Sequence, residues 1–381
     1  MRVQRLRYDA ANGWSGAFPE LDTPNVLILV FGASRYLDAP APIGELRRRY
    51  PAAVLTGCSS SGEVFDDNVF DDSLSVAIVA FDATTVRMAV ENLRADATST
   101  ALGRTLAARL DTPDLRSVML LSDGLGINGT ELARGITEHL PEDVIVTGGL
   151  AGDGDRFART WVIDQDGVPR SGLVVAIGFY GDAICVGHGS RGGWNAFGPE
   201  REITRAEQNV LFELDGKPAL DLYKEYLGAR AAGLPATGLL FPLAIRRDGD
   251  EEQLVRTILS VDERAKSMTF AGDIPQGCRA QLMMANFDRL IDGAAQAAQL
   301  ARRDDEHALT TFAIAISCVG RRLVLGERAD EELEATLHAL PSDAQMVGFY
   351  SYGEISPNDA GTVELHNQTM TLTTIQERCA P

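Results

Sequence analysis

The chain has 381 residues, 45% of them apolar, and a formal net charge of −19. These values predict a globular protein with a large core and two or three domains. The negative charge opposes binding to phosphate backbones and to acidic lipid surfaces, so neither nucleic acid nor a membrane is an expected partner.

The cysteines and the N-terminus indicate a reducing location. The five cysteines are scattered and form no CxxC motif, which argues against a disulfide framework or a zinc knuckle. The longest early apolar run, Val26 to Phe31, is too short to span a bilayer, and the basic N-terminus lacks the apolar core of a signal peptide. We therefore expect a cytoplasmic protein.

The first part of the chain has the pattern of a mixed α/β layer. Short runs rich in Val, Ile and Leu alternate with helix-like segments at 101–110 and 130–140. A strand at 74–81 follows a turn-rich stretch that leaves no room for a crossover helix, so we expect mixed rather than parallel sheets. Further strands are predicted at 160–163, 172–180 and 183–188, and a helix at 218–227.

A domain boundary is predicted at 229–237, which is rich in Ala, Gly and Pro. It divides the chain into an N-terminal domain, 22–228, and a C-terminal domain, 238–376. In the second domain, strands at 254–261 and 267–270 are followed by a long helix at 287–302, with Asn286 as its N-cap.

One unit of strand, loop, helix, strand and glycine loop occurs three times. Its second strand ends in a loop that contains glycines, small or aromatic residues and an acid; the three copies are 54–63, 146–153 and 346–354. Its first strand ends in a polar loop, at 26–35, 117–129 and 311–322. The sequence therefore predicts an α/β (mixed α+β) fold, in which the repeated units form mixed sheets in two domains.

Paired glycines at strand ends indicate loops that clasp a ligand or cross one another tightly, because glycine permits positive φ and close backbone approach. Repetition places such loops on one side of the sheets. We expect Gly57, Gly62, Gly348 and Gly353 to have backbone conformations that are costly for other residues, with the first and third loops close together. The acids Glu63 and Glu354 should accept hydrogen bonds from backbone amides or pair with arginine.

Two local motifs raise enzyme or cofactor hypotheses. Gly124 to Gly129 satisfies GxGxxG, but Asp123 precedes it and the next strand ends in threonine and glycine, so a tight turn and helix cap is favoured over a dinucleotide site. Cys58 resembles a nucleophile in a strand-end turn, yet the spacing is one residue too long for GxSxG and a hairpin follows. The repeated loops share no nucleophile, so no enzyme is expected; an enzyme that uses Cys58 or Cys318 stays the alternative.

Two of the five histidines could bind a ligand. His188 is flanked by glycines, which would let a flat ligand approach the imidazole, while Arg191 could pair with a carboxylate and Trp194 could wall a pocket. His366 lies in a segment rich in hydrogen-bonding side chains. For each, a structural histidine with backbone partners is the competing interpretation.

Several of these motifs, in this order, resemble the FIST domain, a bacterial sensory module with N- and C-terminal parts. They are the segments at 57–63 (GCSSSGE), 148–154 (GGLAGDG), 213–220 (ELDGKPAL) and 348–355 (GFYSYGEI), and the resemblance covers nearly the whole chain. The resemblance implies an intracellular sensor of a small ligand. The candidate ligand-binding residues are Gly57, Cys58, Ser59, Ser60, Gly62, Glu63, Gly149, Tyr350, Tyr352, Glu354, Arg191 and Trp194.

The stretch Leu365 to Thr371 is similar to the end of stand-alone members of this family that contain haem, sense nitric oxide and regulate a histidine kinase. This resemblance implies haem b, since CxxCH is absent. His188 is then the first candidate for the proximal ligand and His366 the second, with propionates paired to Arg191, Arg201 or Arg205. The expected partner is a histidine kinase or a cyclic-dinucleotide signalling protein. A sensor of another small metabolite, such as an amino acid, stays open, as does a homodimer.

Overall fold

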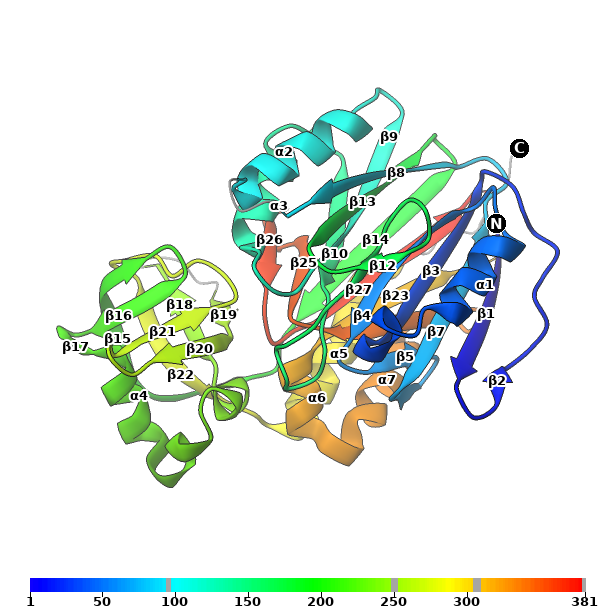
Figure 1. Ribbon diagram of the computed structural model, residues 1–381. Coiled ribbons are helices and arrows are strands. Elements are labelled where there is room, and N and C mark those ends of the chain that lie inside the picture. Colours follow the sequence, from blue (N-terminus) through cyan, green and yellow to red (C-terminus); the bar gives the residue numbers. More distant parts are fainter. Residues whose placement is uncertain (94–96, 248–252, 304–309, 379–381) are drawn as a thin grey trace.

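The computed structural model of the chain describes residues 1–93, 97–247, 253–303 and 310–378. Three mixed sheets form the larger part of the molecule, and a fourth sheet stands to one side of them (Figure 1). The first sheet consists, in spatial order, of β12 (Pro169–Arg170), β11 (Val162–Ile163), β4 (Val54–Ser60), β3 (Val26–Ala33), β7 (Ser73–Ala80), β1 (Arg2–Asp9) and β2 (Gly13–Trp14).

The second and third sheets repeat the centre of the first. The second consists of β26 (Val363–His366), β25 (Gly353–Pro357), β10 (Ile145–Leu150), β9 (Leu115–Ser122), β13 (Leu173–Tyr180) and β8 (Thr85–Asn92). The third consists of β14 (Ile184–Arg191), β27 (Met370–Glu377), β23 (Phe312–Cys318), β24 (Gln345–Ser351), β5 (Glu63–Phe65) and β6 (Asn68–Phe70). In each sheet the two strands of one repeat are parallel neighbours: β3 with β4, β9 with β10, and β23 with β24.

The central strands of each of the three sheets are buried on both faces. Their inner faces share one apolar core, to which β3 contributes Leu27, Leu29 and Phe31. Alternate residues of the same strand, such as Val26 and Ile28, lie in a separate outer core. This arrangement explains why the strands read as continuous apolar runs, since a strand covered on both faces has no solvent side.

Helices form the outer layer. They are α1 (Ala41–Arg49) on the first sheet, α2 (Ser99–Leu110) and α3 (Gly129–Thr137) on the second, and α5 (Phe287–Ala301), α6 (Val319–Leu325) and α7 (Ala329–Ala339) beside the third. The predicted N-cap Asn286 is confirmed, since its side chain accepts a hydrogen bond from the Arg289 amide at 3.1 Å. The helix cap expected at Gly124 to Gly129 is made by Asn128, whose side chain accepts from the Glu131 amide at 3.2 Å. Within the described part of the chain, no helix has the length and apolar character needed to cross a bilayer.

The fourth sheet has its own core. It consists of β19 (Leu254–Arg256), β18 (Leu243–Arg246), β22 (Arg279–Met284), β15 (Asn195–Glu207), β16 (Val210–Leu214), β21 (Ser267–Phe270) and β20 (Ile258–Asp262), with β17 (Lys217–Pro218) paired to β16. The helix α4 (Ala219–Leu227) packs on it, and the short 3₁₀ segments Gly228–Gly233 and Ala236–Leu240 follow. Two further 3₁₀ segments, Ser34–Leu37 and Gly326–Arg328, belong to the larger part.

The predicted mixed α/β fold with repeated units is confirmed. In space, segments from both sides of the predicted boundary share sheets, because β24 pairs with β5, β25 with β10, and β14 with β27. The residue bounds 22–228 and 238–376 therefore stay a prediction from the sequence. The separate body in Figure 1 is formed by the described residues 195–247 and 253–284.

Candidate functional site

The three glycine loops meet and close a ring of backbone hydrogen bonds. Each loop donates one amide to the next: Gly152 to the Ser59 carbonyl at 3.0 Å, Ser61 to the Tyr350 carbonyl at 2.8 Å, and Tyr352 to the Leu150 carbonyl at 3.0 Å. After its loop, each repeat sends its next strand into a neighbouring sheet, so β5 joins β24, β11 joins β4, and β25 joins β10. The expected proximity of the first and third loops is confirmed, and tight crossing is the structural role of these loops.

The first glycine of each loop is required by close packing of parallel strands. A Cβ at Gly57, Gly148 or Gly348 would lie 1.8 to 2.0 Å from a backbone oxygen of the neighbouring strand. Gly62 has a φ of +146°, which L-residues rarely adopt. The expected costly backbone conformation is present at Gly57 and Gly62 but not at Gly348 and Gly353, where φ is not positive and the cost of a side chain is collision alone.

The three acids are buried and accept hydrogen bonds, as expected for Glu63 and Glu354. Glu63 accepts from the Ser73 amide and hydroxyl, both at 2.9 Å, and Glu354 accepts from the Thr369 amide and hydroxyl at 3.2 and 2.9 Å. Burial nevertheless raises the pKa of the Glu63 and Glu354 carboxyls to about 8, against the opposing effect of these hydrogen bonds.

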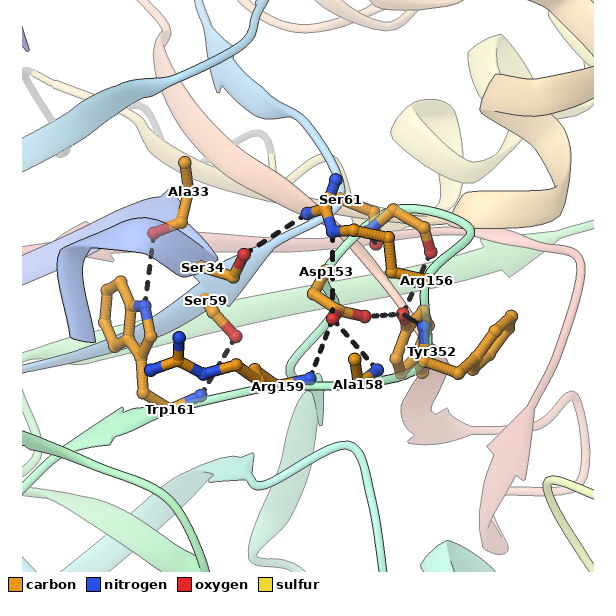
Figure 2. Close-up of polar contacts among 12 residues, drawn as sticks. Ala33, Ser34, Ser59, Ser61, Asp153, Arg156, Ala158, Arg159, Trp161 and Tyr352 are labelled. Carbon is orange, nitrogen blue, oxygen red and sulfur yellow. Dashed lines mark hydrogen bonds and ion pairs between the residues drawn. The ribbon is translucent and has the colours of Figure 1, made fainter. Parts of the chain in front are cut away.

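Asp153 is the acid of the second loop, and its carboxylate joins this loop to the third (Figure 2). Its carboxylate accepts from the Ala158 and Arg159 amides at 3.0 and 2.8 Å and from the hydroxyl of Tyr352 in the third loop. The Gly154 amide in turn donates to the hydroxyl of Ser61 in the first loop at 2.9 Å. The second loop is thus clamped between the other two.

A cavity of about 540 Å³, the glycine-loop cavity, opens beside the first and second loops. Of the expected ligand-binding residues it brings together Ser60, Gly62 and Glu63, and it adds Arg156 and Arg322. The Arg322 guanidinium pairs with Asp71 at 2.6 Å and donates to the Ser61 carbonyl. Both cations therefore lie over the buried hydroxyls and carboxyl of the first loop.

The remaining loop candidates lie in the packed interior and line none of the cavities described for this protein; they are Gly57, Cys58, Ser59, Gly149, Tyr350, Tyr352 and Glu354. Both candidate nucleophiles, Cys58 and Cys318, are completely buried. Burial raises the pKa of each thiol, which opposes formation of the reactive thiolate. This environment argues against the cysteine-dependent enzyme.

A second cavity, of about 520 Å³, lies where the third sheet meets the fourth, and we name it the junction cavity. It is lined by His188, Arg191 and Trp194, which belong to one short segment, and by His366, which lies far along the chain from them. Apolar side chains of the fourth sheet and of α5 also line it, namely Leu254, Val255, Met283 and Leu300, and polar groups that include Asn358 and Asp359 line the rest. The cavity therefore has imidazole, cationic and apolar groups on its walls.

His188 is half-buried in the edge strand β14, and its imidazole makes no hydrogen bond with the described residues. Burial and the nearby Arg303 lower its pKa, so the imidazole is neutral at pH 7. The glycines beside it have a different role from the expected one. A Cβ at Gly187 or Gly189 would lie 1.9 or 2.2 Å from carbonyl oxygens of α5, so these glycines permit helix packing rather than ligand approach.

The other candidates at the junction cavity have protein partners. His366 is bonded through Nε2 to the Ser356 carbonyl at 3.0 Å, and burial lowers its pKa to about 4, so its free nitrogen is Nδ1. Trp194 donates from its indole nitrogen to the Gln368 carbonyl at 2.9 Å. Arg191 pairs with Asp359 at 3.0 Å.

The expected contribution of Arg201 and Arg205 is not supported. They lie on β15 and pair with Asp215 and Glu213, and neither lines the junction cavity. The regular β14 strand also places His188 and Arg191 on opposite faces, as their odd spacing requires, although both reach the same cavity at the sheet edge.

Sequence reasoning missed three residues that the structure places at the loops: Asp153, Arg156 and Arg322. The repeat itself could have identified Asp153, because it occupies the acid position of the second copy. Arg156 and Arg322 carry no such local signal. Arg322 lies on α6, which only the tertiary fold brings against the first loop.

Comparisons with known proteins agree with the repeat and its motifs. Residues 26–217 match the FIST N domain, and residues 219–357 match the FIST C domain. No curated protein matches the chain significantly. Among solved structures, a cyanuric acid hydrolase from A. caulinodans is similar at 9% identity and a TM-score of 0.35, over 100% of this chain and 99% of that one, a similarity too low to support an argument. The chain belongs to the FIST family, whose domains are signal-transduction sensor domains that bind small ligands.

Proposed function

We propose that this protein is a haem-based sensor, responsive to nitric oxide, and that the junction cavity is its ligand site. The observation that carries the proposal is that His366 meets His188, Arg191 and Trp194 at one cavity, whose other walls combine apolar side chains with polar ones. Ligand cavities of several hundred Å³ with apolar walls and a few polar groups are typical of cofactor sites.

The residues present fit haem b. His188 is neutral and has ring nitrogens without hydrogen-bond partners among the described residues, as a metal ligand requires. His366 fits less well, because its Nε2 is bonded to a backbone carbonyl and only Nδ1 is open. Arg303 also lines the cavity and would pair with one haem propionate. Arg191 would pair with the other after its ion pair with Asp359 has broken.

Haem, when bound, supplies an iron to which a diatomic gas can coordinate. The chain would hold it at His188, exclude water with Trp194 and Leu254, and contact both the third and the fourth sheet. A ligand that binds one arrangement of the two sheets more tightly shifts the population toward it. This shift is the proposed signal to a partner such as a histidine kinase or a cyclic-dinucleotide signalling protein.

Titration with haemin tests the proposal. We expect a Soret shift in the wild type that is lost or strongly altered in His188→Ala. The matched control is His338→Ala, because His338 is an exposed histidine on α7. A shift that persists unchanged in His188→Ala would exclude His188 and favour His366. If the wild type shows no shift, a sensor of another small metabolite, such as an amino acid, becomes the leading function.

A further inference from the structure

A third cavity, of about 280 Å³, lies between α3 and β26 on one side and the fourth sheet on the other. We name it the arginine cavity, because Arg134, Arg247 and Arg256 line it. No sequence motif identified it, and the proposed sensor site does not include these arginines.

Arg256 is only 3% exposed, and burial lowers its pKa. Its hydrogen bonds go to backbone carbonyls alone: those of Asp273 at 3.2 Å, Leu365 at 2.9 Å and Val255 at 3.4 Å. Among the described residues no carboxylate lies within ion-pair distance of it. A buried charge without a counter-ion is costly, so Arg256 requires an explanation.

The two carboxylates of the cavity do not balance its three arginines. Asp273 accepts a hydrogen bond from the Asn128 side chain at 2.8 Å, and Glu364 accepts one from Asn358 at 3.4 Å. Arg134 and Arg247 are exposed, and the hydrogen bond from Arg134 to the Thr100 hydroxyl is long, at 3.5 Å, so both side chains can turn toward a ligand in the cavity. Among the described residues that line the cavity, the result is an excess of positive charge, on a protein whose net charge is −19.

We propose that the arginine cavity binds a small organic anion, a carboxylate or a phosphate, with Arg256 as the buried anchor and Arg134 and Arg247 as outer contacts. The planar guanidinium donates two parallel hydrogen bonds to either anion. The volume lies near the lower end of the range for small-molecule pockets, about 300 Å³, so the ligand is a small metabolite rather than a nucleotide.

Such an anion would join the two parts of the molecule. Arg134 belongs to α3 on the second sheet, whereas Arg256 belongs to β19 of the fourth. Leu254 and Asn358 line both the arginine cavity and the junction cavity, so an anion in one contacts a wall of the other. Binding should therefore couple the two cavities, whatever ligand occupies the junction cavity.

Isothermal titration with inorganic phosphate and with succinate, at ionic strength held constant by sodium chloride, tests the proposal. We expect saturable one-site binding of at least one probe to the wild type. Arg134→Gln and Arg247→Gln should each weaken it by about tenfold, as loss of a charged hydrogen bond predicts. The control is Arg264→Gln, which removes one exposed charge from the turn between β20 and β21 and should leave the affinity unchanged.

Arg256→Lys is the sharpest variant, because it keeps the charge and removes the planar fork. With a native circular dichroism spectrum, it should lose binding by more than either outer variant. If Arg256→Lys does not fold, Arg134→Gln and Arg247→Gln decide the question. The proposal is overturned if neither probe shows saturable binding. It is also overturned if Arg134→Gln and the control weaken the binding of the probe equally, since that pattern shows only general charge attraction.

Discussion

At the residue scale, burial determines the protonation of the loop acids Glu63 and Glu354. Glu63 and Glu354 accept hydrogen bonds that favour the ionised form, yet removal from water dominates and raises the pKa of both carboxyls to about 8. Because these groups are buried within crossing loops, their first role is to stabilise the loops.

The pKa of Glu63 predicts a dependence of stability on pH. Its folded-state pKa of about 8 exceeds the ordinary 4.5, so the folded protein holds this proton more tightly than the unfolded chain does. The resulting stabilisation is complete below about pH 4.5 and is lost as the pH rises to about 8. Glu63→Gln, which stays neutral, should gain stability relative to wild type over this range, by at most about 5 kcal/mol.

Urea unfolding at about pH 5 and pH 8.5 measures the difference between wild type and Glu63→Gln. Glu138→Gln is the control, because Glu138 is exposed and its pKa is lowered by Arg104, so it is already ionised throughout this range. Parallel stability curves for the wild type and Glu63→Gln would show that the carboxyl does not titrate as its burial implies.

At the element scale, the fold depends on strands that cross between sheets. Each crossing brings a glycine of one parallel strand against the backbone of its neighbour. The helix α6 supports the crossing of the first and third loops with two adjacent arginines. Arg322 donates to the Ser61 carbonyl, while Arg321 forms a completely buried ion pair with Glu332 at 2.8 Å and donates to the Gly192 carbonyl at 2.6 Å.

Gly348→Ala tests the crossing of the third repeat. Its Cβ would lie 1.8 Å from the Ala315 carbonyl oxygen, so β23 and β24 would have to separate, and we expect a loss of about 3 kcal/mol in the free energy of unfolding. At Gly353 the nearest atom is the flexible end of Leu365 at 2.9 Å, so the same change should cost less there.

Gly44→Ala is the control for Gly348→Ala. Gly44 lies inside α1, and a Cβ there meets only the end of Arg48 at 3.6 Å, so alanine should stabilise the helix by about 1 kcal/mol. Urea denaturation measures both variants. Wild-type stability in Gly348→Ala would mean that the strands can separate at little cost.

At the scale of the whole molecule, the segment between β26 and β27 joins the fourth sheet to the larger part. The Gln368 side chain donates to the Leu239 carbonyl and to the Thr257 hydroxyl, both at 3.0 Å, and the Arg256 guanidinium donates to the Leu365 carbonyl. The junction and arginine cavities lie beside these contacts, so the strength of the junction is the quantity that a ligand would change.

Gln368→Leu should weaken this junction without unfolding the protein. Loss of its hydrogen bonds to Leu239 and Thr257 should speed amide hydrogen exchange in the adjoining segment Ala236–Leu240 by about tenfold. Gln281→Leu is the control, because Gln281 bonds to the Gly198 carbonyl within the fourth sheet. Unchanged exchange in Gln368→Leu would show that other contacts hold the junction.

The sequence by itself determined the local features. Apolar runs gave the strands, Asn128 and Asn286 gave helix starts, and the threefold pattern of glycines and acids gave the repeat with its crossing loops. These features depend on backbone conformation and on burial of neighbouring residues, and both produce a periodic pattern in the sequence.

Only the tertiary structure decided the non-local features. It showed which sheet each loop crosses into, that Gly187 and Gly189 pack against α5, and that His188 and His366 share one cavity. It also brought Arg256 to the face of α3 without a carboxylate partner among the described residues. These pairings depend on how the three sheets exchange strands and meet in a ring. No local segment encodes this arrangement, because each contact joins residues far apart in the chain.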